Sequence, residues 1–216
     1  LLRHTAVENF TGTDSAGLLK VMAPLLNDPV KSVRMEAANR LSTYRKDAFN
    51  EIQYRLFRKA MDEYKSSLEY VADFPSGRFN LGNYYSKIKD IMKAEENYRE
   101  AITIDNLFYP AKANLAILCY QEGKIEEAEK LFLDLVTNHP ELTEGYYYLA
   151  LLYGEQKKYP EAIALLEKSA ARAGSNTRIF YNLGLLYQMT GQDAKCETTL
   201  IKGLSLDPCN YDMLYA

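Results

Sequence analysis

Apolar residues recur along most of this chain with the spacing of amphipathic helices. In the segment 75–108, Leu81 and Tyr85 are four residues apart and share one helical face, and Ala94 and Tyr98 do the same further along. Polar residues fill the positions between them. The pattern predicts an all-α fold built from antiparallel helix pairs.

The same pattern returns every 34 residues without a gap. Four copies cover 75–108, 109–142, 143–176 and 177–210. The seventh place is always Leu, the eighth is always small, and the eleventh is Tyr or Cys. In chain order these places hold Leu81, Leu115, Leu149 and Leu183; Gly82, Ala116, Ala150 and Gly184; and Tyr85, Cys119, Tyr153 and Tyr187.

The small places indicate where the two helices of a pair cross closely. A bulky side chain there would push the helix axes beyond the usual separation of roughly 8–10 Å. The twentieth place is also small in three copies, with Ala94, Ala128 and Ala162. Gly123 and Gly191 are placed to end the first helix in two copies. One pair cannot bury its apolar face alone, so the copies are expected to stack into a solenoid.

At these positions the chain resembles the tetratricopeptide repeat family over residues 75–210. The resemblance implies a right-handed superhelical solenoid of antiparallel helix pairs. The sequence departs from the family pattern at Lys89 and Lys157, which replace the turn glycine, and at Cys196, which replaces the small alanine. Residues 211–216 look like the start of a truncated fifth repeat.

The first 46 residues follow a different pattern. Leu2-Arg3 with Ala6-Val7 recurs 31 residues later as Val33-Arg34 with Ala37-Ala38, and Asp28-Pro29 precedes the second copy. These residues resemble HEAT-type repeats, so that residues 1–46 are expected to form a short HEAT-like helical array. Residues 47–74 are expected to form a connecting helix, equivalent to half a repeat.

HEAT-like repeats followed by tetratricopeptide repeats also resemble the C-terminal part of bacterial multihaem c-type cytochromes with doubled CxxCH motifs. That resemblance implies a docking or assembly arm of a larger exported protein, and a periplasmic or exported location. Without it, a cytoplasmic location is expected, and the sequence leaves the compartment open. This chain contains no CxxCH, so no haem and no other cofactor is expected here. Because the chain lacks an initiator Met, we expect it to be part of a longer protein.

Composition excludes several classes of function. The net charge is -3, from 26 basic and 29 acidic residues, which does not resemble the basic surface of a nucleic-acid-binding protein. Apolar runs are far shorter than the roughly 20 residues of a membrane-spanning helix. The three cysteines and two histidines show no metal-ligand spacing, and no nucleotide-binding or nucleophile motif occurs. We therefore expect neither an enzyme nor a metal site.

The family resemblance also implies where a ligand would bind. In tetratricopeptide proteins, the first helix of each pair lines a concave face. The candidate ligand-binding residues at such places in this chain are Phe79, Asn80, Asn83, Lys87, Asn114, Tyr120, Tyr147, Tyr148, Arg178, Tyr181 and Asn182.

Two interpretations of this face stay open. Asn80, Asn114 and Asn182 could bind the backbone of an extended peptide, because an amide both donates and accepts hydrogen bonds. Alternatively, these asparagines are common family residues and the aromatic residues pack between helices. A clamp for a terminal carboxylate is disfavoured, because Glu144 and Tyr148 stand where some relatives carry cations.

The sequence therefore predicts a non-catalytic scaffold that binds a partner protein or an extended peptide. It also predicts self-association, since a truncated repeat at 211–216 would leave an apolar end uncovered.

Overall fold

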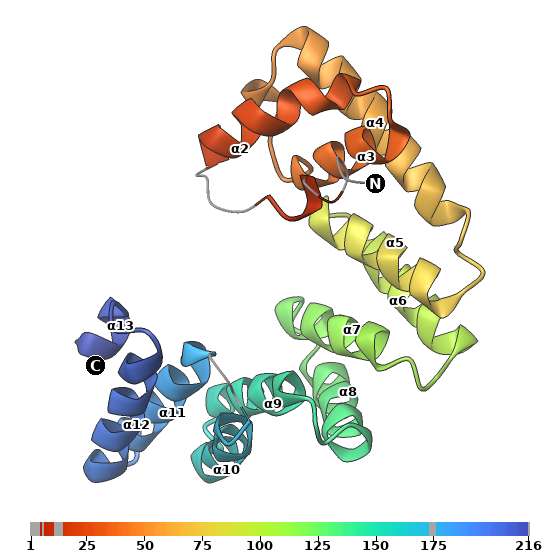
Figure 1. Ribbon diagram of the computed structural model, residues 1–216. Helices are drawn as coiled ribbons and strands as arrows, with labels where there is room; N and C mark the ends of the chain where they lie inside the picture. The colour runs from red at the N-terminus through yellow and green to blue at the C-terminus, as the bar shows by residue number, and fades with distance from the viewer. Residues whose placement is uncertain (1–4, 6, 11–14, 173–175, 216) are drawn as a thin grey trace. The chain divides into compact units, whose positions relative to one another are not determined.

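The computed structural model describes residues 5, 7–10, 15–172 and 176–215. Throughout these residues the regular elements are helices, and none of them is assigned to a strand. The chain forms two compact units, Leu1–Phe108 and Tyr109–Ala216. The helices of each unit are labelled in Figure 1. The unit boundary coincides with the boundary between the first two 34-residue copies.

The first unit begins with short helices and ends with one complete helix pair. Its elements are α2 (Ser15–Met22), the 3-10 helix η1 (Ala23–Asn27), α3 (Lys31–Arg40), the 3-10 helix η2 (Lys46–Ala48), α4 (Glu51–Glu69), α5 (Pro75–Lys87) and α6 (Ile91–Ile104). Helix α3 packs on α4, α4 on α5, and α5 on α6. Met22, Leu26, Val33 and Leu41 are almost fully buried and form the centre of the first core.

The connecting segment, expected to be helical over residues 47–74, contains the helix α4 over Glu51–Glu69. Helix α4 begins at Glu51, because Asn50 caps it. The backbone N–H of Gln53 donates to Asn50 Oδ1 at 2.9 Å, and the Asn50 N–H donates to Gln53 Oε1 at 3.0 Å. This reciprocal pair satisfies two N–H groups that a helix start leaves without partners. Phe49 and Phe57 stack at 4.9 Å between ring centres and anchor the start of the helix to the core.

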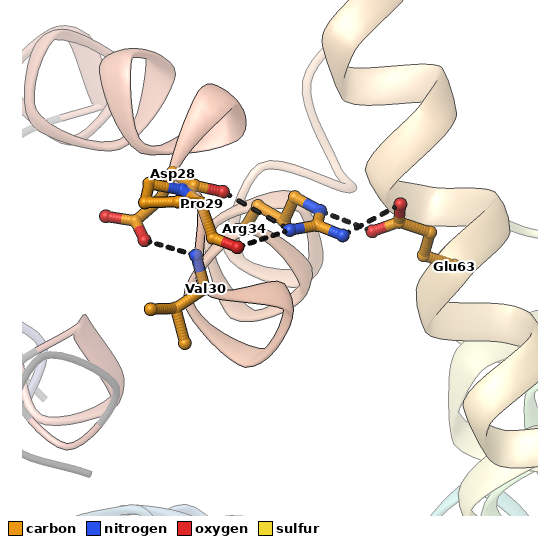
Figure 2. Close-up of polar contacts among 5 residues, drawn as sticks. All are labelled: Asp28, Pro29, Val30, Arg34 and Glu63. Carbon is orange, nitrogen blue, oxygen red and sulfur yellow. Dashed lines mark hydrogen bonds and ion pairs between the residues drawn. The ribbon is translucent and has the colours of Figure 1, made fainter.

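An arginine joins three parts of the first unit. Arg34 on α3 makes a two-pronged contact with Glu63 on α4, with Nε–Oε2 at 2.5 Å and Nη2–Oε1 at 3.0 Å. Its Nη1 also donates to the carbonyls of Asp28 and Pro29 (Figure 2). The Asp28 carboxylate accepts the Val30 N–H at 2.8 Å, which fixes the turn before α3. The Asp-Pro…Val-Arg segment therefore has a local structural role. The first copy of this motif falls largely on residues 1–4 and 6, outside the described residues.

The second unit consists of three helix pairs and the start of another helix. Its elements are α7 (Tyr109–Gln121), α8 (Ile125–Asn138), α9 (Thr143–Glu155), α10 (Tyr159–Ala170), α11 (Thr177–Met189), α12 (Asp193–Leu206) and α13 (Tyr211–Leu214). Helices pair as α7 with α8, α9 with α10, and α11 with α12. Each second helix also packs on the first helix of the next pair, so that the core runs from pair to pair.

The turns inside the helix pairs require a left-handed backbone conformation. Gly123 and Gly191 adopt φ of 73° and 69° just after their helices end. Lys89 and Lys157 occupy the equivalent places with φ of 66° and 60°. A side chain in this conformation is strained because its Cβ approaches the backbone. The same turn geometry is thus built with and without glycine.

The small eighth place is where the paired helices approach most closely. A Cβ added to Gly184 would lie 2.6 Å from Leu200 Cδ2 of the neighbouring helix. Ala150, at the same place in the preceding pair, and Ala162 of the paired helix belong to one core cluster and are at most 1% exposed. The close crossing predicted from the sequence is confirmed.

Candidate functional site

The first helices α7, α9 and α11 of the second unit are connected to one another by polar side chains. The Tyr120 hydroxyl on α7 donates to Glu155 Oε1 on α9 at 2.5 Å. The Asn182 amide on α11 donates to the Tyr147 hydroxyl on α9 at 3.1 Å. Both pairs are 35 residues apart, one more than the repeat length. These bonds, here called the cross-repeat bonds, lie on the surface that the sequence predicts to face a ligand.

A cavity of about 330 Å³ lies between these helices, beside both cross-repeat bonds. Its volume is at the lower end of the range for ligand pockets, which suits one or two side chains of a peptide. Most of its lining is apolar, with a few polar groups. The lining residues are Tyr120, Ala150, Leu151, Gly154, Glu155, Tyr159, Leu166, Asn182, Leu185, Leu186 and Met189.

Tyr120 and Tyr147 on this surface are held in their neutral form. Partial burial raises the pKa of Tyr120, and the hydrogen bond to Glu155 raises it further, because a phenolate could not donate to the carboxylate. Burial also raises the pKa of Tyr147, while the nearby Arg178 charge and the Asn182 amide oppose that shift. Both hydroxyls therefore remain hydrogen-bond donors at physiological pH.

The Asn182 amide is largely committed within the chain. Its nitrogen donates to the Tyr147 hydroxyl and also to the Arg178 carbonyl, at 3.1 and 2.9 Å. An amide nitrogen has two hydrogens, so both are used. The side-chain oxygen remains the group that Asn182 could offer to a peptide N–H. Asn114 is half-buried on α7 and has internal interactions of its own.

The three consecutive tyrosines separate as helical geometry requires. Tyr146 is 7% exposed and belongs to the core. Tyr147 and Tyr148 are half-buried, and Tyr148 stacks on Phe132 at 5.7 Å between ring centres. Tyr181 is also half-buried and packs against the core of the second unit. The aromatic residues of this surface therefore contribute to packing between helices.

Four candidate residues, Phe79, Asn80, Asn83 and Lys87, lie on α5 of the first unit. Phe79 packs on Tyr98 and, edge to face, on Phe108, with ring centres 6.1 and 5.7 Å apart. Asn83 Oδ1 accepts a hydrogen bond from the Tyr98 hydroxyl at 2.8 Å. Asn80 is exposed to solvent. Of the two asparagines, Asn80 therefore presents the more accessible side-chain amide.

Lys87, also on α5, is occupied by an internal contact. Its ammonium donates to the Asn39 carbonyl at 2.5 Å and to Asn39 Oδ1 at 3.0 Å. Partial burial lowers the pKa of Lys87, and the Glu36 charge opposes this shift. The contact joins the end of α3 to the end of α5, so that Lys87 has a structural role within the first unit.

The candidate set from the sequence omits part of the cavity. Glu155 and Met189 end their helices, and Tyr159 begins a second helix. Glu155 stands at a ligand-facing place of the repeat, so the repeat pattern could have added it to the candidate set. Nothing in the periodicity of a single helix indicates Tyr159, because its position depends on how helix pairs pack.

Models of one protein family match most of the repeat region. Two models, both described as tetratricopeptide repeat, match residues 114–177 and residues 76–106 and 177–209. Together these matches cover more than half of the chain. The chain belongs to the tetratricopeptide repeat family. Proteins of this family mediate protein–protein interactions and are typically non-catalytic scaffolds.

Over the aligned residues, the curated relatives are about a quarter identical to this chain. The BBSome complex member BBS4 homolog of Drosophila melanogaster is 25% identical over 80% of this chain and 35% of its own length. TPR repeat-containing protein MJ1428 of Methanocaldococcus jannaschii is 26% identical, with 90% and 34% covered. Human protein O-mannosyl-transferase TMTC3 is 26% identical, with 63% and 15% covered. This chain therefore spans about a third or less of each of these relatives.

Solved structures share the fold at low sequence identity. The pilF protein of Pseudomonas aeruginosa superimposes with a TM-score of 0.65 at 18% identity, covering 99% of this chain and 92% of that one. YrrB, described as a TPR protein with an unusual peptide-binding site, gives 0.58 at 16% identity, with 93% and 98% covered. MamA gives 0.60 at 20% identity, with 69% and 87% covered. These similarities establish an all-α fold of tetratricopeptide-solenoid type.

The comparisons do not support the other two resemblances. The matched segments lie within residues 76–209, so the HEAT-like interpretation of residues 1–46 gains nothing from them. The multihaem cytochrome resemblance is likewise not supported.

None of the helices in the described part of the chain is both long and apolar enough to cross a membrane. No group of three His, Cys, Asp or Glu side chains in that part of the chain could hold a metal ion.

Proposed function

We propose that this chain is a non-catalytic module that holds an extended segment of a partner protein on the face formed by its first helices. The cavity between α9 and α11 is the main support for this proposal. It combines an apolar lining with the hydroxyl of Tyr120, the carboxylate of Glu155 and the amide of Asn182. Such a mixture suits a peptide, whose side chains need apolar area and whose backbone needs hydrogen bonds.

The chemistry of the chain agrees with binding rather than catalysis. The polar groups beside the cavity are used in hydrogen bonds between repeats. Tyr120 and Tyr147 have raised pKa values, which makes them poor bases at neutral pH. TMTC3 is named as a transferase, but this chain matches only 15% of it. We therefore assign no transferase activity to this chain.

A cavity-filling variant tests the proposal. The wild-type chain would be immobilised and used to select binders from a random 12-residue peptide display library, and affinities of selected peptides would be measured by fluorescence anisotropy. Leu151→Trp fills the cavity and should weaken binding at least tenfold. Leu133→Trp is the matched control, because Leu133 is 42% exposed on α8 and does not line the cavity. Equal affinity of both variants would contradict the proposed site.

The asparagines give a second test. Replacing Asn80, Asn114 and Asn182 together by Ala should reduce affinity by about 10- to 100-fold, since each lost hydrogen bond is worth roughly 0.5–1.5 kcal/mol. Because the Asn182 amide also supports Tyr147, circular dichroism must show unchanged helix content. Unchanged affinity would mean that these amides do not read the peptide backbone.

Self-association through the last helix remains a prediction. Tyr211, Leu214 and Tyr215 on or beside α13 are 71%, 52% and 88% exposed, and they would form the first contacts of such an assembly. Sedimentation at increasing concentration tests it, and strictly monomeric behaviour would contradict it.

A further inference from the structure

The charge in the wall of the cavity between α9 and α11 is negative. Among the described residues that line it, Glu155 is the one acidic residue, and none is Lys or Arg. The Glu155 side chain is solvent-exposed, and its bond from Tyr120 uses one carboxylate oxygen. A positively charged group entering the cavity would therefore meet an opposite charge and no like charge in its walls.

The ends of the first helices add to this negative potential. Glu155 is the last residue of α9, Met189 is the last residue of α11, and Tyr120 is in the last turn of α7. The C-terminal end of a helix carries a partial negative charge, which favours nearby cations. Three C-terminal helix ends therefore lie beside the cavity, against one N-terminal end, that of α10 at Tyr159.

The basic residues that follow α9 do not line the cavity. The Lys158 ammonium lies over the Tyr153 ring, 4.9 Å from its centre. Lys157 is exposed in the turn. Neither Lys157 nor Lys158 is part of the cavity wall, so these two lysines place no positive charge in it.

The remaining lining suits an aliphatic stem. Leu151, Leu185 and Met189 provide apolar surface next to Glu155. Lys and Arg side chains bury their methylene groups along such surfaces while the charged end remains near water or a partner charge. A plain aliphatic side chain would use the apolar wall but leave Glu155 without a partner from the ligand.

We propose that the cavity between α9 and α11 selects a lysine or arginine side chain of the bound segment, with Glu155 as the specificity-determining residue. This inference rests on the proposed function and adds the chemistry of the ligand. An acidic side chain would be repelled by Glu155 and by the helix ends. The selected segment would therefore be basic at this position, opposite in sign to a terminal carboxylate.

Selection from the same random 12-residue peptide library tests the proposal with three forms of the chain. Glu155→Gln keeps the size of the side chain and an oxygen that can accept the Tyr120 hydrogen bond, but it removes the charge. Glu126→Gln is the matched control, since Glu126 is exposed on the second helix α8 and does not line the cavity. We expect Lys and Arg to be enriched by the wild-type chain and by Glu126→Gln, and this enrichment to disappear with Glu155→Gln.

Replacement of the enriched basic residue by norleucine completes the test. The replacement should weaken binding to the wild-type chain about tenfold and leave binding to Glu155→Gln nearly unchanged. The effect of norleucine on binding to the wild-type chain should shrink at high salt, because exposed charges are screened. Selected peptides without a basic preference, or one that survives Glu155→Gln, would overturn the charge selection and leave peptide binding intact. No enrichment over the bare support would overturn both proposals.

Discussion

Close packing between α11 and α12 predicts how alanine substitutions at two glycines should differ. Gly184 and Gly154 are both inside first helices, where alanine favours the helix by about 1 kcal/mol over glycine. A Cβ at Gly154 would be 4.0 Å from Leu186 Cδ2, an ordinary contact, so Gly154→Ala should stabilise the fold by about 0.5–1 kcal/mol.

Gly184→Ala should have the opposite sign. The new Cβ would lie 2.6 Å from Leu200 Cδ2 and 2.9 Å from Leu200 Cγ. Ordinary contact begins at 3.4 Å, so the atoms must separate by about 0.8 Å. Leu200 is only 8% exposed, and such overpacking costs about 1–3 kcal/mol. After the helix gain, the expected net loss is up to about 2 kcal/mol.

A double-mutant cycle isolates the cause. Leu200→Ala alone should cost about 2–5 kcal/mol, because it empties a buried site. In that background the clash is absent, so adding Gly184→Ala should stabilise the chain by about 1 kcal/mol. The expected coupling between the two positions is therefore about 1–3 kcal/mol.

Urea unfolding followed by circular dichroism would measure these changes. Repeat arrays can unfold locally, so hydrogen exchange of peptides from α11 and α12 should show where stability is lost. Equal stability of Gly184→Ala and Gly154→Ala, or a loss with Gly184→Ala that persists in the Leu200→Ala background, would refute the close crossing as the reason for glycine.

Three further predictions follow from particular contacts. Lys157→Gly should stabilise the chain by about 0.5–1 kcal/mol and Gly191→Lys should destabilise it similarly, as measured by urea unfolding, because both residues have a positive φ. Burial and the hydrogen bond to Glu167 raise the pKa of Tyr187 above its ordinary 10.0. The contribution of Tyr187 to stability is therefore complete below about pH 10 and is lost as pH rises through the folded-state pKa. Above about pH 10, the melting temperature of Tyr187→Phe should fall less steeply with pH than that of the wild type. Arg34→Lys cannot keep the two-pronged contact with Glu63, so hydrogen exchange in α3 should accelerate relative to the wild type, and unchanged exchange would contradict the role of Arg34.

The repeat pattern predicted much of the second unit, because the buried places depend on local periodicity. The small residue at 184 and the strained turn at Lys157 are both as the 34-residue alignment indicated. The sequence pattern placed the start of the connecting helix near residue 47, whereas α4 begins at Glu51. A short-range signal was available, because Asn50 and Gln53 have the spacing of a capping box.

The candidate site was harder to predict. Tyr120 and Glu155 meet only because neighbouring first helices pack with an offset of one residue beyond the repeat length. That offset depends on the angle between repeats, which the pattern within one helix does not contain. For the same reason, no pattern of residues indicated that the Asn182 amide donates to the Tyr147 hydroxyl. The contact of Lys87 with Asn39 joins residues 48 apart in the chain and was equally inaccessible.

The cross-repeat bonds have a consequence for how the second unit responds to force. They join α7 to α9 and α9 to α11 through long side chains, so each acts as a short tether between neighbouring repeats. A ligand cation that draws Glu155 away from Tyr120 would loosen one tether and leave the other in place. The compliance of the array under tension would then differ between its empty and occupied forms, so that a pulling experiment could register ligand binding as a change in stiffness.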